Sequence, residues 1–257
     1  MTRTARIASL ASDPAFATLR RSLGVYYGDP AHEARMAALY ARFLKPGDLA
    51  FDIGSHVGDR IGAFRSLGAR VVALEPQPLC LRALQAIYGD DAQVALVGAA
   101  CGARKGAVAL RVNSANPTVT TASEDFVAAA DGARGWEGQN WDSVVEARMT
   151  TLDALISAHG IPAFAKIDVE GFEADVLAGL SQPLPALSFE FTTIQRDVAY
   201  RCLERLAELG AYRFILSLGE SHALARGAWA SREEMAAQIA ALPHEANSGD
   251  VYCVLES

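Results

Sequence analysis

Two acidic residues that close short apolar segments point to cofactor chemistry. The segment Phe51–Gly58 begins apolar, reaches Asp52 and continues through a turn containing Gly54 and Gly58. Further along the chain, a second apolar segment ends at Glu75. The order strand, glycine turn, helix, strand and acid is how an α/β sheet builds a pocket for an adenosine-containing cofactor.

The glycine spacing separates two classes of such cofactors. A dinucleotide site needs glycines two and then three residues apart, so that the backbone can meet a pyrophosphate at a helix N-terminus. Here Gly54 and Gly58 are four residues apart, and Gly62 does not restore the pattern. S-adenosylmethionine has no pyrophosphate, so the turn favours that cofactor.

A site for S-adenosylmethionine needs backbone that lies against its methionine and ribose parts, together with carboxylates. We expect Asp52 near the cofactor's ammonium group and Glu75 on the ribose hydroxyls, because one carboxylate accepts two hydrogen bonds at once. A plain strand-to-helix turn capped by Asp52 is the structural alternative. The residues predicted to contact the cofactor in this region are Asp52, Gly54, Ser55, His56, Gly58, Glu75 and Pro76.

A second group of ionisable residues lies in Lys166–Gly171, at the end of another apolar segment. Strand geometry places Lys166, Asp168 and Glu170 on one side, and three such groups are costly to bury unless they are paired. Asp168 is the first candidate for a general base and a further cofactor contact, and Lys166 could keep it ionised or orient the acceptor. Glu170 and His56 are the next catalytic candidates. Alternatively, Asp168 or Glu170 simply caps the following helix.

Glu190 is a third acid at the end of an apolar segment, and it lies either in the acceptor pocket or on the surface. Oxygen ligands suit magnesium, so Asp168, Glu170 and Glu190 are the candidate ligands of a divalent metal. The sequence does not establish such a metal, and no metal ligand is assigned.

These residues lie in a part of the sequence where predicted strands and helices alternate. The expected fold class is α/β, with a mostly parallel sheet and helices on both faces. The expected strands are 49–53, 70–74, 93–97, 163–167, 186–191, 212–216 and 251–255, and the expected helices are 59–66, 78–88, 151–159, 171–180 and 197–209, with a short one around 232–241.

Two regions depart from this alternation. Residues 1–47 predict an N-terminal helical extension, and residues 48–257 predict the cofactor-binding domain. Within that domain, residues 113–142 are rich in glycine and small polar residues and lie between two extended pieces, 107–112 and 144–149. An insertion of this length is usually functional, so we interpret it as a lid over the pocket.

Composition restricts the partners and the compartment. A formal charge of −7 without a basic block argues against nucleic acid as a partner. The four cysteines are scattered without metal-ligand spacing, as in a reducing compartment. Neither a signal peptide nor an apolar run of about eighteen residues is recognisable, so we expect a cytoplasmic protein that does not enter a membrane.

Five segments together resemble the FkbM family of S-adenosylmethionine-dependent methyltransferases, over roughly residues 44–191. They are residues 44–48, 51–58, 73–76, 151–153 and 166–171, in the order seen in that family. The resemblance implies the Rossmann-like class I methyltransferase fold, a seven-stranded sheet whose last strand, 251–255, is antiparallel. It also implies methyl transfer, commonly to a hydroxyl oxygen of a natural product, sugar or related small molecule. One departure is His56, where the family often has asparagine.

Two other functions share the predicted fold. An NAD(P)-dependent oxidoreductase would also use Glu75, but the dinucleotide glycines are missing. A non-catalytic cofactor-binding protein would need the residues 166–171 to be structural only. The sequence identifies neither the acceptor nor the oligomeric state.

Overall fold

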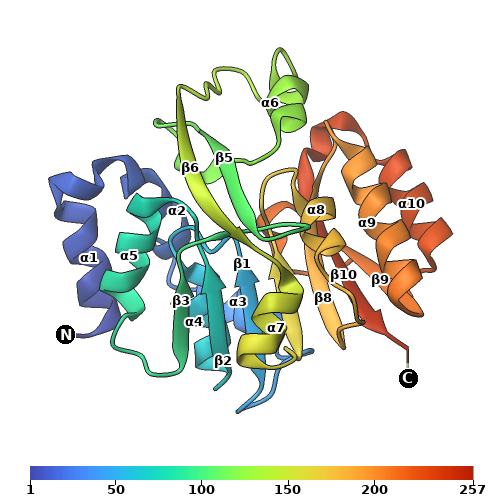
Figure 1. Cartoon of the computed structure of the whole chain (residues 1–257), viewed down its shortest axis with the longest axis horizontal. Helices are drawn as coiled ribbons and strands as arrows, with labels where there is room; N and C mark the ends of the chain where they lie inside the picture. Colours follow the sequence, from blue (N-terminus) through green and yellow to red (C-terminus); the bar gives the residue numbers. More distant parts are fainter. Residues whose placement is uncertain (257) are drawn as a thin grey trace.

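A seven-stranded sheet forms the centre of the molecule in the computed structural model, which describes residues 1–256. The strand order is β3-β2-β1-β7-β8-β10-β9 (Figure 1). The strands are β1 (Leu49–Ile53), β2 (Arg70–Leu74), β3 (Val94–Val97), β7 (Phe164–Ile167), β8 (Ala186–Thr192), β9 (Tyr212–Leu218) and β10 (Ser248–Leu255).

The direction of β10 distinguishes this sheet from an all-parallel one. Strands β3, β2, β1, β7 and β8 pair in parallel, whereas β10 lies antiparallel between β8 and β9. The predicted Rossmann-like fold with an antiparallel last strand is therefore confirmed. Parallel strands end at the same edge, so the acids at the ends of β1, β2, β7 and β8 meet at one edge of the sheet.

Helices cover both faces of the sheet because its strands are apolar on both sides. Ala50 and Phe51 are neighbours in β1, and they belong to two different cores on opposite faces. One face carries α7 (Leu152–His159), α8 (Glu173–Ala178), α9 (Arg196–Leu209) and α10 (Arg232–Ala241). The other face carries α1 (Arg3–Ser12), η1 (Pro14–Leu19), α2 (Arg20–Tyr27), α3 (His32–Tyr40), α4 (Asp59–Ser66) and α5 (Pro78–Tyr88). The N-terminal helices thus share a core with α4 and α5, and the domain boundary at residue 47 stays a prediction.

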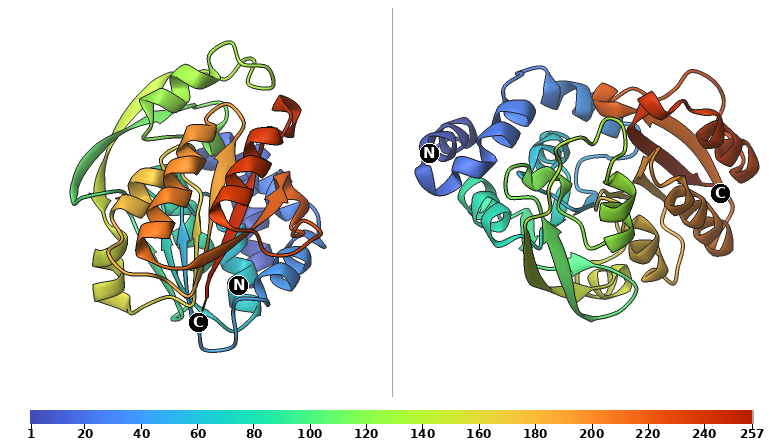
Figure 2. Two further views of the ribbon diagram at one scale, coloured as in Figure 1. Left: turned by 90° about the vertical axis from the view of Figure 1, so that its right-hand side faces the viewer. Right: turned by 90° about the horizontal axis from the view of Figure 1, so that it is seen from above.

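Residues 113–142, which we call the lid, lie above the carboxyl edge of the sheet (Figures 1 and 2). They are carried by the antiparallel pair β5 (Gly106–Val112) and β6 (Ser143–Thr150), and β6 also pairs with the short β4 (Ala100–Cys101). The lid contains η2 (Pro117–Val119) and α6 (Glu124–Ala130), neither of which the sequence analysis predicts. Helix α6 forms because Ser123 caps it by accepting from the backbone N–H of Phe126.

One predicted helix begins later than expected. The spacing predicts a helix from residue 171, but α8 begins at Glu173. Gly171 has a left-handed φ of +88°, and the Glu173 side chain accepts from the backbone N–H groups of Val169 and Gly171. The turn after β7 is therefore tied down by the helix that follows it. Across residues 1–256, every helix is too short or too polar to reach through a bilayer.

The turns after β1 and β7 approach each other so closely that no side chain fits at Gly54. A Cβ at Gly54, where φ is +90°, would lie 1.8 Å from the carbonyl oxygen of Asp168. We therefore expect Gly54→Ala to destabilise the protein by about 4 kcal/mol, measured by urea unfolding.

Gly47→Ala is the matched control. Gly47 has a nearly identical φ of +88°, but nothing lies within 4 Å of a Cβ there. Its replacement should lower the free energy of unfolding by about 1–2 kcal/mol, because alanine is unfavourable in the left-handed conformation. Equal losses for the two variants would contradict the close packing of the two turns.

Candidate functional site

A cavity of about 240 Å³ lies between the carboxyl edge of the sheet and the lid. One end is lined by residues after β1, β2 and β3, and the other by residues of α2, α4, β8 and β10. Glu75, Pro76 and Gln77 belong to the first end, and Glu190 and Ser248 belong to the second. Asp168 and Glu170 also line the cavity.

Glu75 is fixed at the first end by two backbone donors. It is 3 % exposed, and its two carboxyl oxygens accept from the backbone N–H groups of His56 and Gln77, each at 2.8 Å. Burial raises the pKa of Glu75 to about 8, against the opposing effect of these two hydrogen bonds. The carboxyl group is thus held in one orientation, with Pro76 and Gln77 beside it in the cavity wall. This arrangement suits the two adjacent hydroxyls of a ribose.

The glycine turn is bonded to the end of β2. The backbone N–H groups of Gly54 and Ser55 donate to the carbonyl of Leu74 at 3.0 and 2.9 Å. Gly54 lines the cavity, so backbone is exposed to a ligand there. Ser55 is buried at 2 % exposure, and its hydroxyl donates to the carbonyl of Asp52. The turn is therefore a rigid wall of the cavity.

Asp52 and Gly58 lie behind this wall rather than in it. Asp52 is 1 % exposed, neither of its carboxyl oxygens has a hydrogen-bond partner among the described residues, and burial raises its pKa to about 6. A Cβ at Gly58 would lie 2.6 Å from Leu84 and 2.8 Å from Tyr88, so this glycine lets α4 pack against α5. Direct contact of Asp52, Ser55 or Gly58 with a cofactor stays a prediction.

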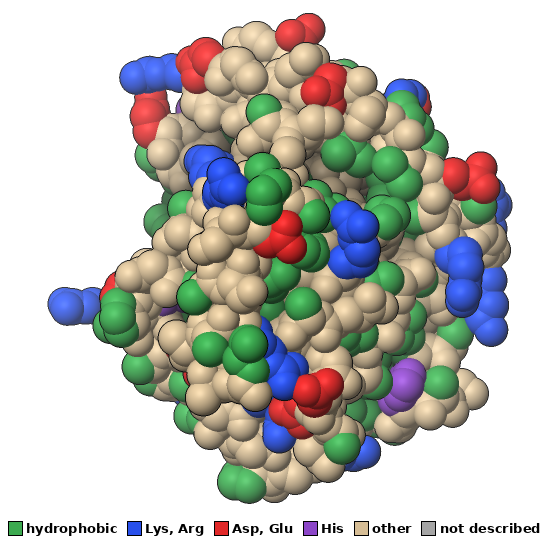
Figure 3. Space-filling view, turned by 90° about the vertical axis from the view of Figure 1, so that its left-hand side faces the viewer, with side chains coloured by type: hydrophobic (Ala, Val, Ile, Leu, Met, Phe, Trp, Pro, Cys, Tyr) green, Lys and Arg blue, Asp and Glu red, His purple; other side chains and the backbone are tan. Residues whose placement is uncertain are grey.

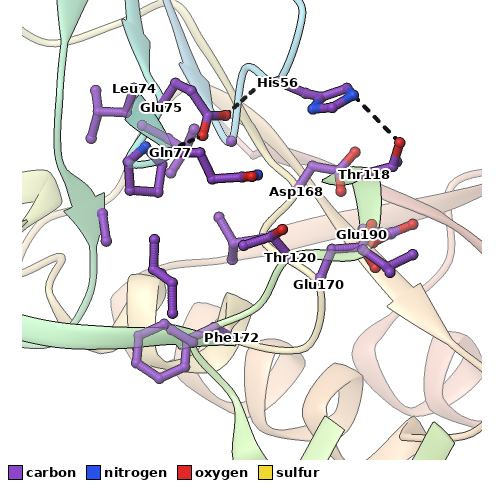
Figure 4. Close-up of a pocket in the computed structure, with 18 of the residues that line it drawn as sticks. His56, Leu74, Glu75, Gln77, Thr118, Thr120, Asp168, Glu170, Phe172 and Glu190 are labelled. Carbon is purple, nitrogen blue, oxygen red and sulfur yellow. Dashed lines mark hydrogen bonds between the residues drawn. The ribbon is translucent and has the colours of Figure 1, made fainter. Parts of the chain in front are cut away.

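His56 lines the cavity and reaches towards the lid. Its Nε2 lies 3.4 Å from the hydroxyl of Thr118, and its Nδ1 lies 3.6 Å from the Sγ of Cys80 (Figure 4). Burial lowers the pKa of His56 to about 4, so the ring is neutral at neutral pH. It has a left-handed φ of +45°, a conformation that histidine and asparagine adopt more readily than most residues.

Asp168 lies at the centre of a buried ionic network. One of its oxygens is 2.8 Å from Arg60 and 3.1 Å from Lys166, and Lys166 lies 2.7 Å from Asp250. Burial alone would raise the pKa of Asp168, but Lys166 and Arg60 hold it below its usual range. Burial would likewise lower the pKa of Lys166, and its two carboxylate partners raise it instead. Asp168 is therefore ionised, and Lys166 supports it from below the cavity at 0 % exposure.

Glu170 and Glu190 differ from Asp168 although they lie beside it. One oxygen from each of the three residues lies within 4.8 Å of the others, and their side chains gather in one part of the cavity (Figure 4). Burial and the charge of Asp168 raise the pKa of Glu170 and of Glu190 well above the usual value. Both carboxyls therefore favour the protonated form, whereas Asp168 favours the ionised form.

These three carboxyls have the ligand chemistry and spacing that a hard cation such as magnesium requires. Binding of such an ion would require Glu170 and Glu190 to lose their protons. A divalent metal at this place is not established, and no metal ligand is assigned.

Several residues of the site are not singled out in the sequence. Tyr26, Asp59, Gln77, Thr118 and Glu220 line the cavity, and they come from separate segments of the chain. Arg60 is the one such residue that its local sequence could have indicated. A cation in the first turn of a helix interacts unfavourably with the helix dipole, so its presence there suggests a specific acidic partner.

The comparisons with known proteins are consistent with this geometry. The family model described as the methyltransferase FkbM domain matches residues 52–216. No curated protein matches the chain.

Three solved structures are similar in fold. A TehB-like SAM-dependent methyltransferase from Corynebacterium glutamicum has 10 % identity and a TM-score of 0.45, covering 94 % of this chain and 96 % of its own. An rRNA methylase from Streptococcus thermophilus has 12 % identity and a TM-score of 0.43, covering 89 % and 98 %. A precorrin-6y C5,15-methyltransferase from Geobacter metallireducens has 14 % identity and a TM-score of 0.40, covering 88 % and 87 %.

The raised pKa of Glu190 has a consequence for stability. A carboxyl with a raised folded-state pKa gives its full stabilisation below the unfolded pKa of about 4.5, and this is lost as pH rises through the folded value. Glu190→Gln keeps the shape of the protonated carboxyl but does not titrate, so its free energy of unfolding relative to wild type should increase between pH 6 and pH 9.

Chemical denaturation at the two pH values measures this gain. The exposed Glu146, on β6, provides the control, and Glu146→Gln should show the same difference from wild type at both. A Glu190→Gln advantage that stays constant or shrinks with pH would mean that Glu190 is ionised.

Proposed function

The chain belongs to the FkbM methyltransferase family, and on this premise we propose that it methylates a hydroxyl oxygen of a small-molecule acceptor, using S-adenosylmethionine. The supporting observation is a single cavity that has the Glu75 clamp at one end and the ionised Asp168 at the edge of the other. A cofactor bound across it would have its ribose at Glu75 and its methionine part along Gly54 and Asp168.

The residues of the first end fit such a cofactor. Glu75 is oriented for two hydroxyls, and Gly54 exposes backbone without a side chain. Residues 99–101, which are apolar, also line this end of the cavity, as does Gln77. We expect the adenine ring of the cofactor to lie near them. The family and these contacts favour S-adenosylmethionine over a nicotinamide cofactor.

The sulfonium of this cofactor supplies an electrophilic methyl group, so the protein's main contribution is to align the acceptor oxygen. Alignment of this kind is worth roughly 7–11 kcal/mol. Asp168, held ionised by Arg60 and Lys166, is placed to accept the hydroxyl's hydrogen bond. In such a transfer the oxygen–carbon bond would form as the carbon–sulfur bond broke, and Asp168 would take the hydroxyl proton. Because the pKa of Asp168 is low, it orients the hydroxyl first and takes the proton late.

The acceptor end favours a neutral hydroxyl compound over an anion. Asp168 is ionised there and would repel an anion, and the cation of Arg60 is already paired with Asp168. On the face seen in Figure 3, Lys and Arg side chains are scattered among Asp and Glu. Together with the formal charge of −7, this supports a small molecule rather than a nucleic acid as acceptor. The cytoplasmic location stays a prediction.

Cofactor identity is tested by calorimetric titration with S-adenosylhomocysteine on wild type and Glu75→Ala, with NADH as the control ligand. We expect binding of S-adenosylhomocysteine alone, weakened about 10- to 100-fold in the variant because two hydrogen bonds to a carboxylate are lost. Binding of NADH instead, or unchanged affinity in Glu75→Ala, would contradict the proposed cofactor site.

Turnover tests the role of Asp168. Asp168→Asn should lower kcat about 10²- to 10⁴-fold while changing S-adenosylhomocysteine affinity only a few-fold. The measurement is release of S-adenosylhomocysteine over a panel of polyhydroxylated small molecules, with RNA as a further acceptor. Loss of cofactor affinity in the variant would make Asp168 a binding residue. Cofactor binding without turnover on any acceptor would favour a non-catalytic protein, and turnover on RNA would overturn the acceptor class.

A further inference from the structure

The two residues that clamp Glu75 also hold the lid. The backbone N–H groups of Gln77 and His56 donate to the Glu75 carboxyl. Their side chains extend the other way: Gln77 Nε2 donates to the carbonyl of Pro117 at 3.1 Å, and His56 Nε2 lies 3.4 Å from the Thr118 hydroxyl (Figure 4). Pro117 and Thr118 are adjacent lid residues, so the predicted ribose site and the lid share two neighbouring contacts.

The lid is built as a unit of its own. Val119, Phe126, Ala130 and Trp136 form a small core that is separate from the two cores of the sheet. Trp141 donates from its indole N–H to the carbonyl of Val119 at 2.8 Å, within the same unit. Covalent connection to the rest of the chain runs through β5 and β6. A unit of this kind can move as one body on its two strands.

Polar contacts tie the lid to the domain at other points. Thr121 donates from its hydroxyl to the carbonyl of Glu170 at 2.6 Å, next to the acceptor end. At the surface, Arg21 donates to Asn116 at 2.7 Å, and Arg134 pairs with Glu245 at 2.9 Å. Each such hydrogen bond or exposed ion pair contributes on the order of 1 kcal/mol. Apolar packing adds to them, because Ile194 packs against the lid core.

We propose that Gln77 and His56 are positioning residues that couple occupation of the cofactor site to closure of the lid. A ligand that fixes Glu75 also fixes the backbone of Gln77 and His56, and their side chains then hold Pro117 and Thr118. Closure brings Thr121 onto Glu170 and completes the acceptor end, so the cofactor binds before the acceptor. This inference rests on the proposed function, because it takes the ribose of S-adenosylmethionine as the ligand of Glu75.

Coupling between two sites is reciprocal, which allows it to be measured from either side. Two of the three tryptophans, Trp136 and Trp141, lie in the lid, and Trp229 lies outside it. Arg134 is a lid residue whose side chain is 76 % exposed, and trypsin cleaves after arginine. Lid closure can therefore be followed by tryptophan fluorescence and by the rate of tryptic cleavage after Arg134, identified by mass spectrometry.

The experiment compares wild type with Gln77→Met, with and without S-adenosylhomocysteine. Methionine keeps the size of the side chain and the backbone N–H to Glu75, but it cannot donate to Pro117. In wild type we expect the ligand to change the fluorescence and to slow cleavage after Arg134 about 10-fold or more, within the usual range of coupling. In Gln77→Met, the protection should fall to a few-fold or less, and ligand affinity should weaken about 2- to 10-fold.

Two further variants separate coupling from general loosening of the lid. Thr118→Val removes the partner of His56 on the lid side, together with the contact between Thr118 and Ser22 of α2, and should reduce protection as Gln77→Met does, without touching the clamp. Arg21→Ala removes a surface tether that has no contact with Glu75 or its donors. It should speed cleavage with and without ligand by the same factor, leaving the protection ratio and the affinity unchanged.

The outcomes distinguish this inference from the proposed function. If calorimetry shows ligand binding but cleavage and fluorescence in wild type do not respond, the coupling is overturned and the cofactor assignment stands. The coupling is also overturned, with the cofactor site intact, if Arg21→Ala lowers the protection ratio as much as Gln77→Met. If S-adenosylhomocysteine does not bind at all, the proposed function fails and the coupling fails with it.

Discussion

The site depends on a buried lysine. Taking Lys166 out of water costs several kcal/mol, which only well-placed opposite charges can offset. Asp168 comes directly after the end of β7, which carries Lys166, but Asp250 comes from β10, the strand that enters the sheet antiparallel between β8 and β9. Register places Asp250 opposite Glu190, at the same edge as Asp168. The reversed direction of the last strand therefore supplies the second partner of Lys166.

This network divides the carboxyls of one cavity into two kinds. Asp168 has two cations within 3.1 Å and stays ionised, whereas the charge of Asp168 and burial raise the pKa of Glu170 and Glu190 and favour their protonated form. Environments that push pKa values apart assign different roles to chemically similar groups. Here the ionised group can orient a hydroxyl, and the uncharged groups can donate as well as accept hydrogen bonds. A polyhydroxylated acceptor suits such a mixture.

Local patterns predicted the elements well and the site in part. Strands β1 and β2 and helices α4, α5 and α10 have the predicted bounds, since apolar periodicity and glycine or proline signals decide them locally. Glu75 and Asp168 follow from their place at strand ends. Asp250 and Gln77 could not be found this way, because their roles come from contacts with Lys166, 84 residues away, and with Pro117, 40 residues away. A place at a strand end does not always put a residue in the site. Asp52 has such a place, but it is buried beneath the turn and does not line the cavity.

Position 56 shows how one residue can serve two sites through different atoms. Its backbone N–H fixes Glu75, and this contact is independent of the side chain. Its ring reaches Thr118 in the lid and Cys80 in α5. The asparagine common in the resembling family would tolerate the same left-handed backbone and keep the bond to Glu75, but its side chain is shorter. A histidine at position 56 therefore changes the contact with the lid, whereas the backbone hydrogen bond to Glu75 is independent of this change.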